Sequence, residues 1–82
     1  MTTQTTVMDD QFVAFRVRYE LKQQDRSVRE LARALDMPPS SMHRRVSGET
    51  PFSATEIGLV AQVLDVDVAV FFPPRPSGRE RA

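Results

Sequence analysis

The stretch SVRELARALDMPPSSMHRRVSG, from Ser27 to Gly48, carries the clearest structural signals of this chain. Ser27, with Glu30 three residues later, forms a capping box, the side-chain pair that closes the start of a helix. Apolar residues then recur at the spacing of one helix face: Val28, Leu31, Ala32 and Leu35. These signals predict a short helix that packs one face against a core.

A second short helix is expected after a tight turn that ends at Pro38. Proline suits the first turn of a helix, so this helix begins at Pro38 or Pro39, and Gly48 provides the usual stop. With about 100° of rotation per residue, Met42 and Val46 fall on one side of it and can dock it on the core. The opposite side is small, polar and basic: Ser40, Ser41 and Arg44, flanked by His43 and Arg45.

Two short helices joined by a tight turn, the second with an exposed basic face, form the outline of a helix-turn-helix. This shape fits an α-helix into the major groove of DNA. Arginine hydrogen-bonded twice to guanine is the commonest specific base contact. Arg44 lies near the centre of the outward face, and we expect it to make that contact. The alternative is that this face is only a solvated surface, as most charged helix faces are.

Helical signals continue on both sides of this stretch. Asp9 or Asp10 can cap a helix that runs to about Gln24. Ser53 with Glu56 forms a second capping box and opens another helix. The apolar stripe of that helix consists of Ile57, Val60, Ala61 and Leu64.

The end of the domain is open to two interpretations. Asp67 can cap a last short helix at residues 68–72, whereas the β-propensity of residues 66–72 favours a strand, which would have no partner. We expect an all-α domain of four to five helices over residues 9–72. Residues 1–8 are expected to form a disordered arm, and residues 73–82 a disordered tail.

The composition excludes several classes of protein. The 82 residues suit one small domain, and they include no cysteine, which excludes disulfides and thiolate metal sites. No apolar run approaches the ~18 residues of a membrane span, and the first ten residues lack the basic and apolar stretches of a secretory signal. A cytoplasmic location is therefore the default expectation.

The net charge is zero, but the charges are unevenly distributed. Residues 16–45 carry eight bases against four acids, whereas residues 46–72 carry four acids and no base. A local basic face can neutralise DNA phosphates even when the whole protein is neutral, although long-range attraction is then weak.

The residue types argue against other chemistry. His43 is the only histidine, so no cluster of metal ligands is expected. Ser40 and Ser41 lie on a short exposed helix, without the enclosed pocket that nucleophilic catalysis needs. The three glycines are scattered and form no phosphate-binding loop. We expect a protein that is not an enzyme and binds no metal, cofactor, small-molecule ligand or membrane.

The first helix has two apolar faces. One face consists of Val13, Ala14, Val17 and Leu21, and the nearly opposite one of Phe12, Phe15 and Tyr19. Two interpretations stay open: the C-terminal segment folds back and clasps this helix against the core, or the aromatic face binds a second copy or a partner protein. A further apolar patch favours dimerisation through the C-terminal segment: Val66, Val68, Val70, Phe71 and Phe72.

The order L-A-x-x-L-x-M-P-x-S-S-M-x-R-R-V-S-G-E-x-P-F-S, beginning at Leu31, resembles the lambda-repressor-like, Cro/C1 or XRE class of helix-turn-helix regulators. The resemblance covers about residues 12–72 and implies a compact five-helix domain that binds operator DNA, usually as a dimer. It implies base contacts from Pro39, Ser40, Ser41 and Arg44. It implies contacts to the DNA backbone or flanking positions from Ser27, Val28, His43, Arg45, Ser47 and Thr50.

Three positions depart from the pattern of that family. Asp36 stands where a glycine is frequent between the two helices, and must tolerate the turn, which aspartate can do. Pro38 replaces the capping serine or threonine before the second helix of the motif. Val28 replaces a frequent glutamine and cannot donate a hydrogen bond from its side chain.

We therefore expect a sequence-specific regulator of transcription that binds double-stranded DNA. It would be a phage-type repressor acting as a homodimer on a two-fold operator, with half-sites about 34 Å apart. The second hypothesis is a helix-turn-helix fold used to bind a protein, such as a partner regulator, polymerase or a toxin. The acidic second half, the two-faced first helix and the zero net charge favour that alternative.

Overall fold

The computed structural model describes residues 9–73, which form four α-helices and one 3-10 helix and contain no strand. The helices are α1 (Asp10–Gln23), α2 (Val28–Ala34), α3 (Pro39–Val46), α4 (Ala54–Leu64) and the 3-10 helix η1 (Val68–Phe71). The all-α prediction is confirmed. The strand alternative is wrong, because the Asp67 side chain accepts a hydrogen bond from the Ala69 N–H (2.9 Å) and caps η1. The expected arm at residues 1–8 and the expected tail from residue 74 onward lie outside the described residues.

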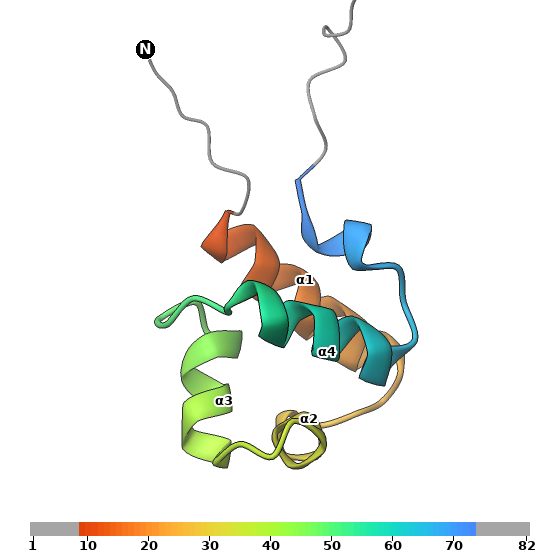
Figure 1. Cartoon of the computed structure of the whole chain (residues 1–82). Helices are drawn as coiled ribbons and strands as arrows, with labels where there is room; N and C mark the ends of the chain where they lie inside the picture. Colours follow the sequence, from red (N-terminus) through yellow and green to blue (C-terminus); the bar gives the residue numbers. More distant parts are fainter. Residues whose placement is uncertain (1–8, 74–82) are drawn as a thin grey trace, which may run out of the picture.

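The helices surround one core, with α3 at the side of the molecule. In Figure 1, α4 crosses in front of α1, α2 lies below and is seen end-on, and α3 stands at the left. α3 packs against α1 and α2, and η1 packs against α1 and α4. One side of α3 therefore remains open.

Within the described part of the chain, no helix combines the length and apolar content of a membrane span.

The N-termini of the helices are closed by the side chains that the sequence indicated. Asp9 caps α1, and both capping boxes are complete. In the first box the Ser27 N–H donates to Glu30 Oε1 (2.8 Å), and in the second the Ser53 N–H donates to Glu56 Oε1 (2.9 Å). These contacts satisfy N–H groups that have no partner within the helix.

All four α-helices end in the same hydrogen-bonded turn. At the end of α2, for example, the Met37 N–H donates to Ala32 O (2.9 Å) and the Asp36 N–H donates to Arg33 O (3.1 Å). This pair of bonds is a Schellman motif, which needs one residue in the left-handed conformation. The left-handed residues are Asp25 (φ 55°), Asp36 (φ 58°), Gly48 (φ 90°) and Asp65 (φ 56°). Asp36 thus tolerates the turn, as its sequence position required.

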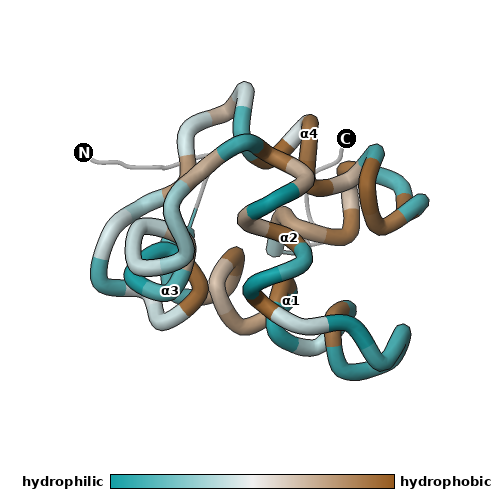
Figure 2. The backbone as a smooth tube through the Cα atoms, turned by 90° about the horizontal axis from the view of Figure 1, so that it is seen from below, coloured by the Kyte–Doolittle hydropathy of each residue, from teal (hydrophilic) through white to brown (hydrophobic). Residues whose placement is uncertain are grey.

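The core contains most of the apolar residues expected on the inner faces of the helices, including Met42 and Val46 from α3, while Val28 and Leu35 are partly buried and pack against it. Figure 2 shows the consequence for hydropathy, since α4 is mostly brown and α3 mostly teal and white. Phe71 was expected on a dimer surface, and that prediction is wrong. The short 3-10 turn directs Phe71 inward, where it is fully buried (0% exposed), while Val68 and Phe72 point outward.

Candidate nucleic-acid interface

The outer face of α3 is polar and open, as predicted. Ser40, His43 and Arg44 are exposed, and so is Pro39 at the start of the helix. Ser41 is half-buried. The helix therefore presents small side chains near its N-terminus and a long arginine about one turn later.

The start of α3 has no side-chain cap, because Pro38 occupies the capping position. The loss is small, since Pro39 has no N–H and the N–H groups of Ser41 and Met42 donate to Pro38 O at 3.1 and 3.2 Å. Within the first turn this leaves the N–H of Ser40 without an acceptor among the described contacts. The backbone at this end can thus approach a groove closely.

Two side chains of α1 hold the C-terminal end of α3. Arg18 Nη1 donates to Val46 O (2.7 Å), and Gln11 Nε2 donates to Gly48 O (3.1 Å). A cation is favourable at this end, because the last carbonyl groups of a helix carry partial negative charge. α1 therefore fixes α3 by hydrogen bonds as well as by apolar packing.

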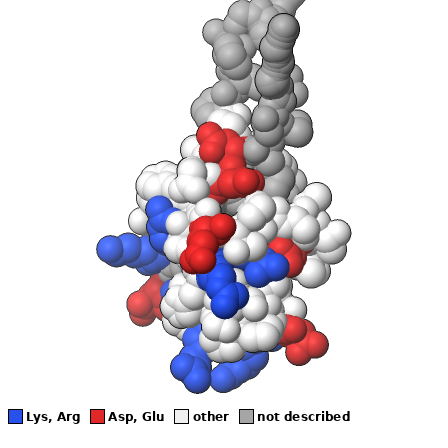
Figure 3. Space-filling view, turned by 90° about the vertical axis from the view of Figure 1, so that its left-hand side faces the viewer, with Lys and Arg blue, Asp and Glu red and all other residues white. Residues whose placement is uncertain are grey.

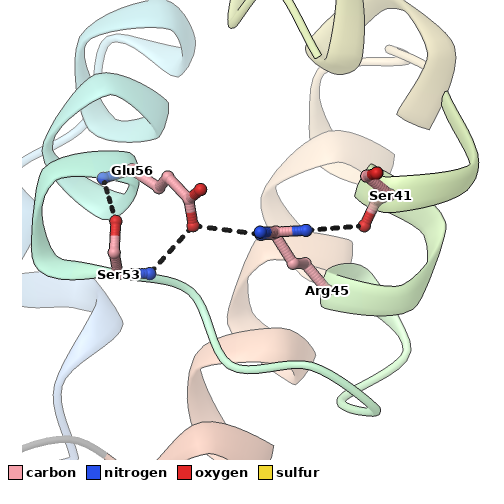
Figure 4. Close-up of polar contacts among 4 residues, drawn as sticks. All are labelled: Ser41, Arg45, Ser53 and Glu56. Carbon is pink, nitrogen blue, oxygen red and sulfur yellow. Dashed lines mark hydrogen bonds and ion pairs between the residues drawn. The ribbon is translucent and has the colours of Figure 1, made fainter. Parts of the chain in front are cut away.

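Arg45 connects α3 to the start of α4 (Figure 4). Its Nε lies 3.0 Å from Glu56 Oε1, and its Nη1 donates to Ser41 O (3.1 Å). The same Glu56 oxygen accepts the Ser53 N–H of the capping box. One carboxylate therefore joins the last turns of α3 to the first turn of α4.

The surroundings of Glu56 favour its charged form. Partial burial pushes the pKa of this carboxyl upward, but the hydrogen bonds from the Ser53 N–H and Arg45, with the positive charge of Arg45, outweigh that effect. The pKa of Glu56 consequently lies below its usual value of 4.5. The pair with Arg45 is thus charged at neutral pH.

Arg44, in contrast, has a free side chain. The described residues form two ion pairs, Arg16–Glu20 and Arg45–Glu56, and Arg44 belongs to neither. Its carbonyl oxygen accepts the N–H groups of Glu49 and Thr50 (2.9 and 3.1 Å), so the backbone is fixed while the guanidinium faces solvent.

The residues expected at the DNA backbone flank α3. Ser27 is exposed, and its hydroxyl accepts the Glu30 N–H (3.0 Å), while Val28 packs partly against the core. The Ser47 hydroxyl donates to Arg44 O (2.9 Å), and Thr50 is half-buried. The structure places these residues around α3, and their contacts to DNA stay a prediction.

An open groove of about 540 Å³ lies between α1, α2 and α3. Four of the predicted residues line it: Ser27, Val28, His43 and Ser47. So do three basic residues that sequence reasoning did not select: Arg18, Lys22 and Arg26. Arg18 and Arg26 donate to the carbonyl oxygens that end α3 and α4, whereas Lys22 is exposed. The spacing of four between Arg18 and Lys22 places both on one helix face, a signal that could have found them.

The charge is patchy around this interface. Figure 3 faces the side on which α3 lies, and Lys and Arg gather over its lower and left parts, with acidic side chains above and at the edges.

Among residues 9–73, no group of three or more His, Cys, Asp or Glu could hold a metal ion.

The aromatic stripe of α1 is left uncovered by the described residues. Phe15 is 51% exposed and Tyr19 is 43% exposed, and their ring centroids lie 6.4 Å apart. Phe12 is half-buried, and the Arg16 guanidinium lies 4.9 Å from the centroid of the Tyr19 ring. In the C-terminal segment Val70 packs partly against the core, and Val68 and Phe72 are exposed. η1 covers part of α1, but two apolar surfaces remain exposed.

Several solved structures are similar to this fold, among them the following two. The hypothetical transcription factor NHTF from Neisseria has a TM-score of 0.71 and 18% sequence identity, with 89% of this chain and 88% of that chain covered. The hydroxypropylphosphonic acid epoxidase from S. wedmorenis has a TM-score of 0.73 and 23% identity over 84% of this chain. This chain spans 37% of the length of that epoxidase. At these identities the likenesses show the fold alone.

Sequence comparison identifies the family. No curated protein matches the chain. A helix-turn-helix family model matches residues 17–71, from the middle of α1 to the end of η1. The chain therefore belongs to the Cro/C1-type helix-turn-helix family of DNA-binding regulators.

Proposed function

We propose that this protein is a sequence-specific transcription regulator that places α3 in the major groove of double-stranded DNA. The observation that carries the proposal is the state of Arg44, which is exposed and unpaired on a helix whose inner side is fixed to the core. A guanidinium held on a fixed helix can present two donors to O6 and N7 of guanine. The name of the similar Neisseria chain, a hypothetical transcription factor, agrees with this role.

The groove beside α3 supports contacts to the DNA backbone. Lys22 and His43 line it from α1 and α3, and Ser27 lines it from the start of α2. Basic and hydroxyl groups of this kind position a protein on the phosphates without reading sequence. The residues that line this groove therefore serve affinity, while Arg44 serves specificity.

The proposed regulator is a phage-type repressor that acts as a homodimer on a two-fold operator. Repression would follow when the bound dimer excludes polymerase or a competing regulator. This function rests on hydrogen bonding and charge, so it involves no catalysis and no cofactor. We place it in the cytoplasm, where such a regulator would meet its operator.

Selection of bound sites from a random duplex pool tests the proposal. We expect a palindromic consensus with a guanine in each half-site, and an affinity that falls steeply with added salt, because bound phosphates release counterions. A pool that shows no enriched sequence, with weak binding to every duplex, would contradict the proposal.

The second candidate function is a protein-interaction module, and the uncovered Phe15 and Tyr19 favour it. Exposed apolar patches of this kind mark contact sites for proteins. This function predicts tight association with a protein partner that changes little with salt, and no shift of any duplex. The same salt titration therefore separates the two functions.

A further inference from the structure

We infer that Arg45 is a positioning residue, which locks the recognition helix α3 to α4 and does not contact a DNA phosphate. This inference rests on the proposed function, since it assigns a role in DNA reading to a residue that the sequence placed beside the DNA backbone. It divides the adjacent arginines of α3 into a reader, Arg44, and a lock, Arg45.

Two hydrogen bonds fix the orientation of the Arg45 guanidinium. Nε binds Glu56 Oε1 (3.0 Å) and Nη1 binds Ser41 O (3.1 Å), in directions that lead toward α4 and back along α3. The side chains of Arg45 and Glu56 are only 21% and 22% exposed. A phosphate contact that turned the guanidinium away from α4 would leave a carboxylate that is itself partly buried, and such a charge is costly to leave unpaired.

The partner of Arg45 is held in place independently. Glu56 Oε1 accepts the Ser53 N–H (2.9 Å), and the Glu56 N–H donates to Ser53 Oγ (3.0 Å). The capping box thus holds the Glu56 carboxylate in place independently of Arg45. An anchored acceptor of this kind restricts the orientation of α3 more than a mobile surface carboxylate would.

α3 needs such a lock because it is short. Its eight residues cannot form a stable helix alone, and the side chains of α1 hold only its C-terminal end. The contact of Arg45 with Ser41 O ties the first half of α3 to the same carboxylate. Two-donor recognition of a base depends on a fixed helix, so a looser α3 would lower the contribution of Arg44.

Three variants test the lock: Arg45→Gln, Glu56→Gln and the double variant. Glutamine can still complete the capping box, so Glu56→Gln removes the ion pair and keeps the start of α4. Each is titrated with the selected duplex and with an unrelated duplex over a range of salt concentrations. The ratio of the two affinities corrects for the change in net charge.

The lock predicts that Arg45→Gln and Glu56→Gln each lower the specificity ratio by about tenfold, equivalent to about 1.4 kcal/mol. The specificity ratio of the double variant should be no lower than the lower ratio of the two single variants, because each single substitution already removes the same contact. The slope of log affinity against log salt should stay that of the parent. A slope reduced by about 0.9 in Arg45→Gln, with an unchanged or raised ratio in Glu56→Gln, would instead assign Arg45 to a phosphate and overturn the inference.

Hydrogen exchange in the free protein provides a readout without DNA. The lock predicts faster exchange of the α3 amides in both single variants, and parent-like exchange at the buried α1 positions Val17 and Leu21. Unchanged exchange in α3 would overturn the lock. If the parent binds no duplex, the proposed function fails, and the exchange data still decide whether Arg45 holds α3.

Discussion

At Gly48 the backbone adopts a conformation that other residues reach only with strain, at φ 90°. A Cβ atom there would also lie 2.7 Å from Oε1 of Gln11, whose amide binds the Gly48 carbonyl. Gly48→Ala should therefore destabilise the protein by about 1–2 kcal/mol, measured by urea unfolding.

Gly58 provides the matched control for that variant. It lies inside α4, and a Cβ atom there would meet nothing within 4 Å. Gly58→Ala should stabilise the protein by about 0.5–1 kcal/mol, since alanine is the better helix former. Equal effects at both positions would contradict the account of the α3 terminus.

Asp36 shows the opposite situation, a non-glycine residue at φ 58°. Asp36→Gly should relieve the left-handed strain and raise the free energy of unfolding by about 0.5 kcal/mol. Thermal and urea unfolding measure the change. A loss of stability would mean that the aspartate side chain stabilises the turn in a way that its exposed position does not show.

Single residues also mark the limit of sequence reasoning. Helical periodicity placed Met42 and Val46 inward and Arg44 outward, because residues four apart in a helix lie on the same face. The partner of Arg45 could not be foreseen, since Glu56 lies eleven residues away on another helix, and only the fold of the chain brings the end of α3 near the start of α4. The inward turn of Phe71 was missed because a single 3-10 turn has too few residues to define a periodicity.

At the scale of elements, the charged carboxylate of Glu56 at the start of α4 helps to hold α3 in place through Arg45. The pKa of Glu56 is lowered, so this carboxylate stabilises the fold above its unfolded pKa, and the contribution disappears as the pH falls through the lower folded pKa. We expect the parent to exceed Glu56→Gln in unfolding free energy by about 1 kcal/mol at pH 7.

That difference should persist down to about pH 5 and shrink at pH values below 4.5, the usual pKa of this group. Urea unfolding of both proteins over a series of pH values measures it. Comparison of the two proteins removes the titration of the other carboxylates. A difference that grows on acidification would contradict a lowered pKa.

Element boundaries were largely predictable, because the chain marks them with local signals. The capping residues Asp9, Ser27, Ser53 and Asp67 each act on amides two or three residues away, so a short sequence window contains the whole interaction. The contacts between elements are different. Arg18 binds Val46 O and Gln24 Nε2 binds Leu64 O (2.7 Å) across separations of 28 and 40 residues, and no local pattern predicts them.

At the scale of the whole molecule, the two uncovered apolar surfaces bear on assembly. The C-terminal surface contains Val68 and Phe72, which are exposed while Phe71 anchors the same segment in the core. We expect dimerisation there, so Val68→Ser with Phe72→Ser should give a folded monomer in sedimentation equilibrium.

The α1 surface supplies the matched control. Phe15→Ser with Tyr19→Ser removes a similar apolar area from exposed positions and should leave the dimer intact. The reverse pattern would assign the dimer to α1. Phe71→Ala should instead destabilise the monomer itself by about 3–5 kcal/mol, because it empties a fully buried site.

The central claim is that Arg44 reads a base from a fixed α3, and anisotropy titration of the selected duplex at about 0.15 M salt tests it most directly. Arg33→Gln, which removes the same charge from an exposed position on α2, is the control. Arg44→Gln should lose about 5- to 150-fold in affinity for the selected duplex, lose little for a duplex with the guanine replaced, and keep the stability of the parent. Arg33→Gln should stay within about threefold of the parent on both duplexes, less than 1 kcal/mol. Equal losses on both duplexes, or none, would contradict base reading by Arg44.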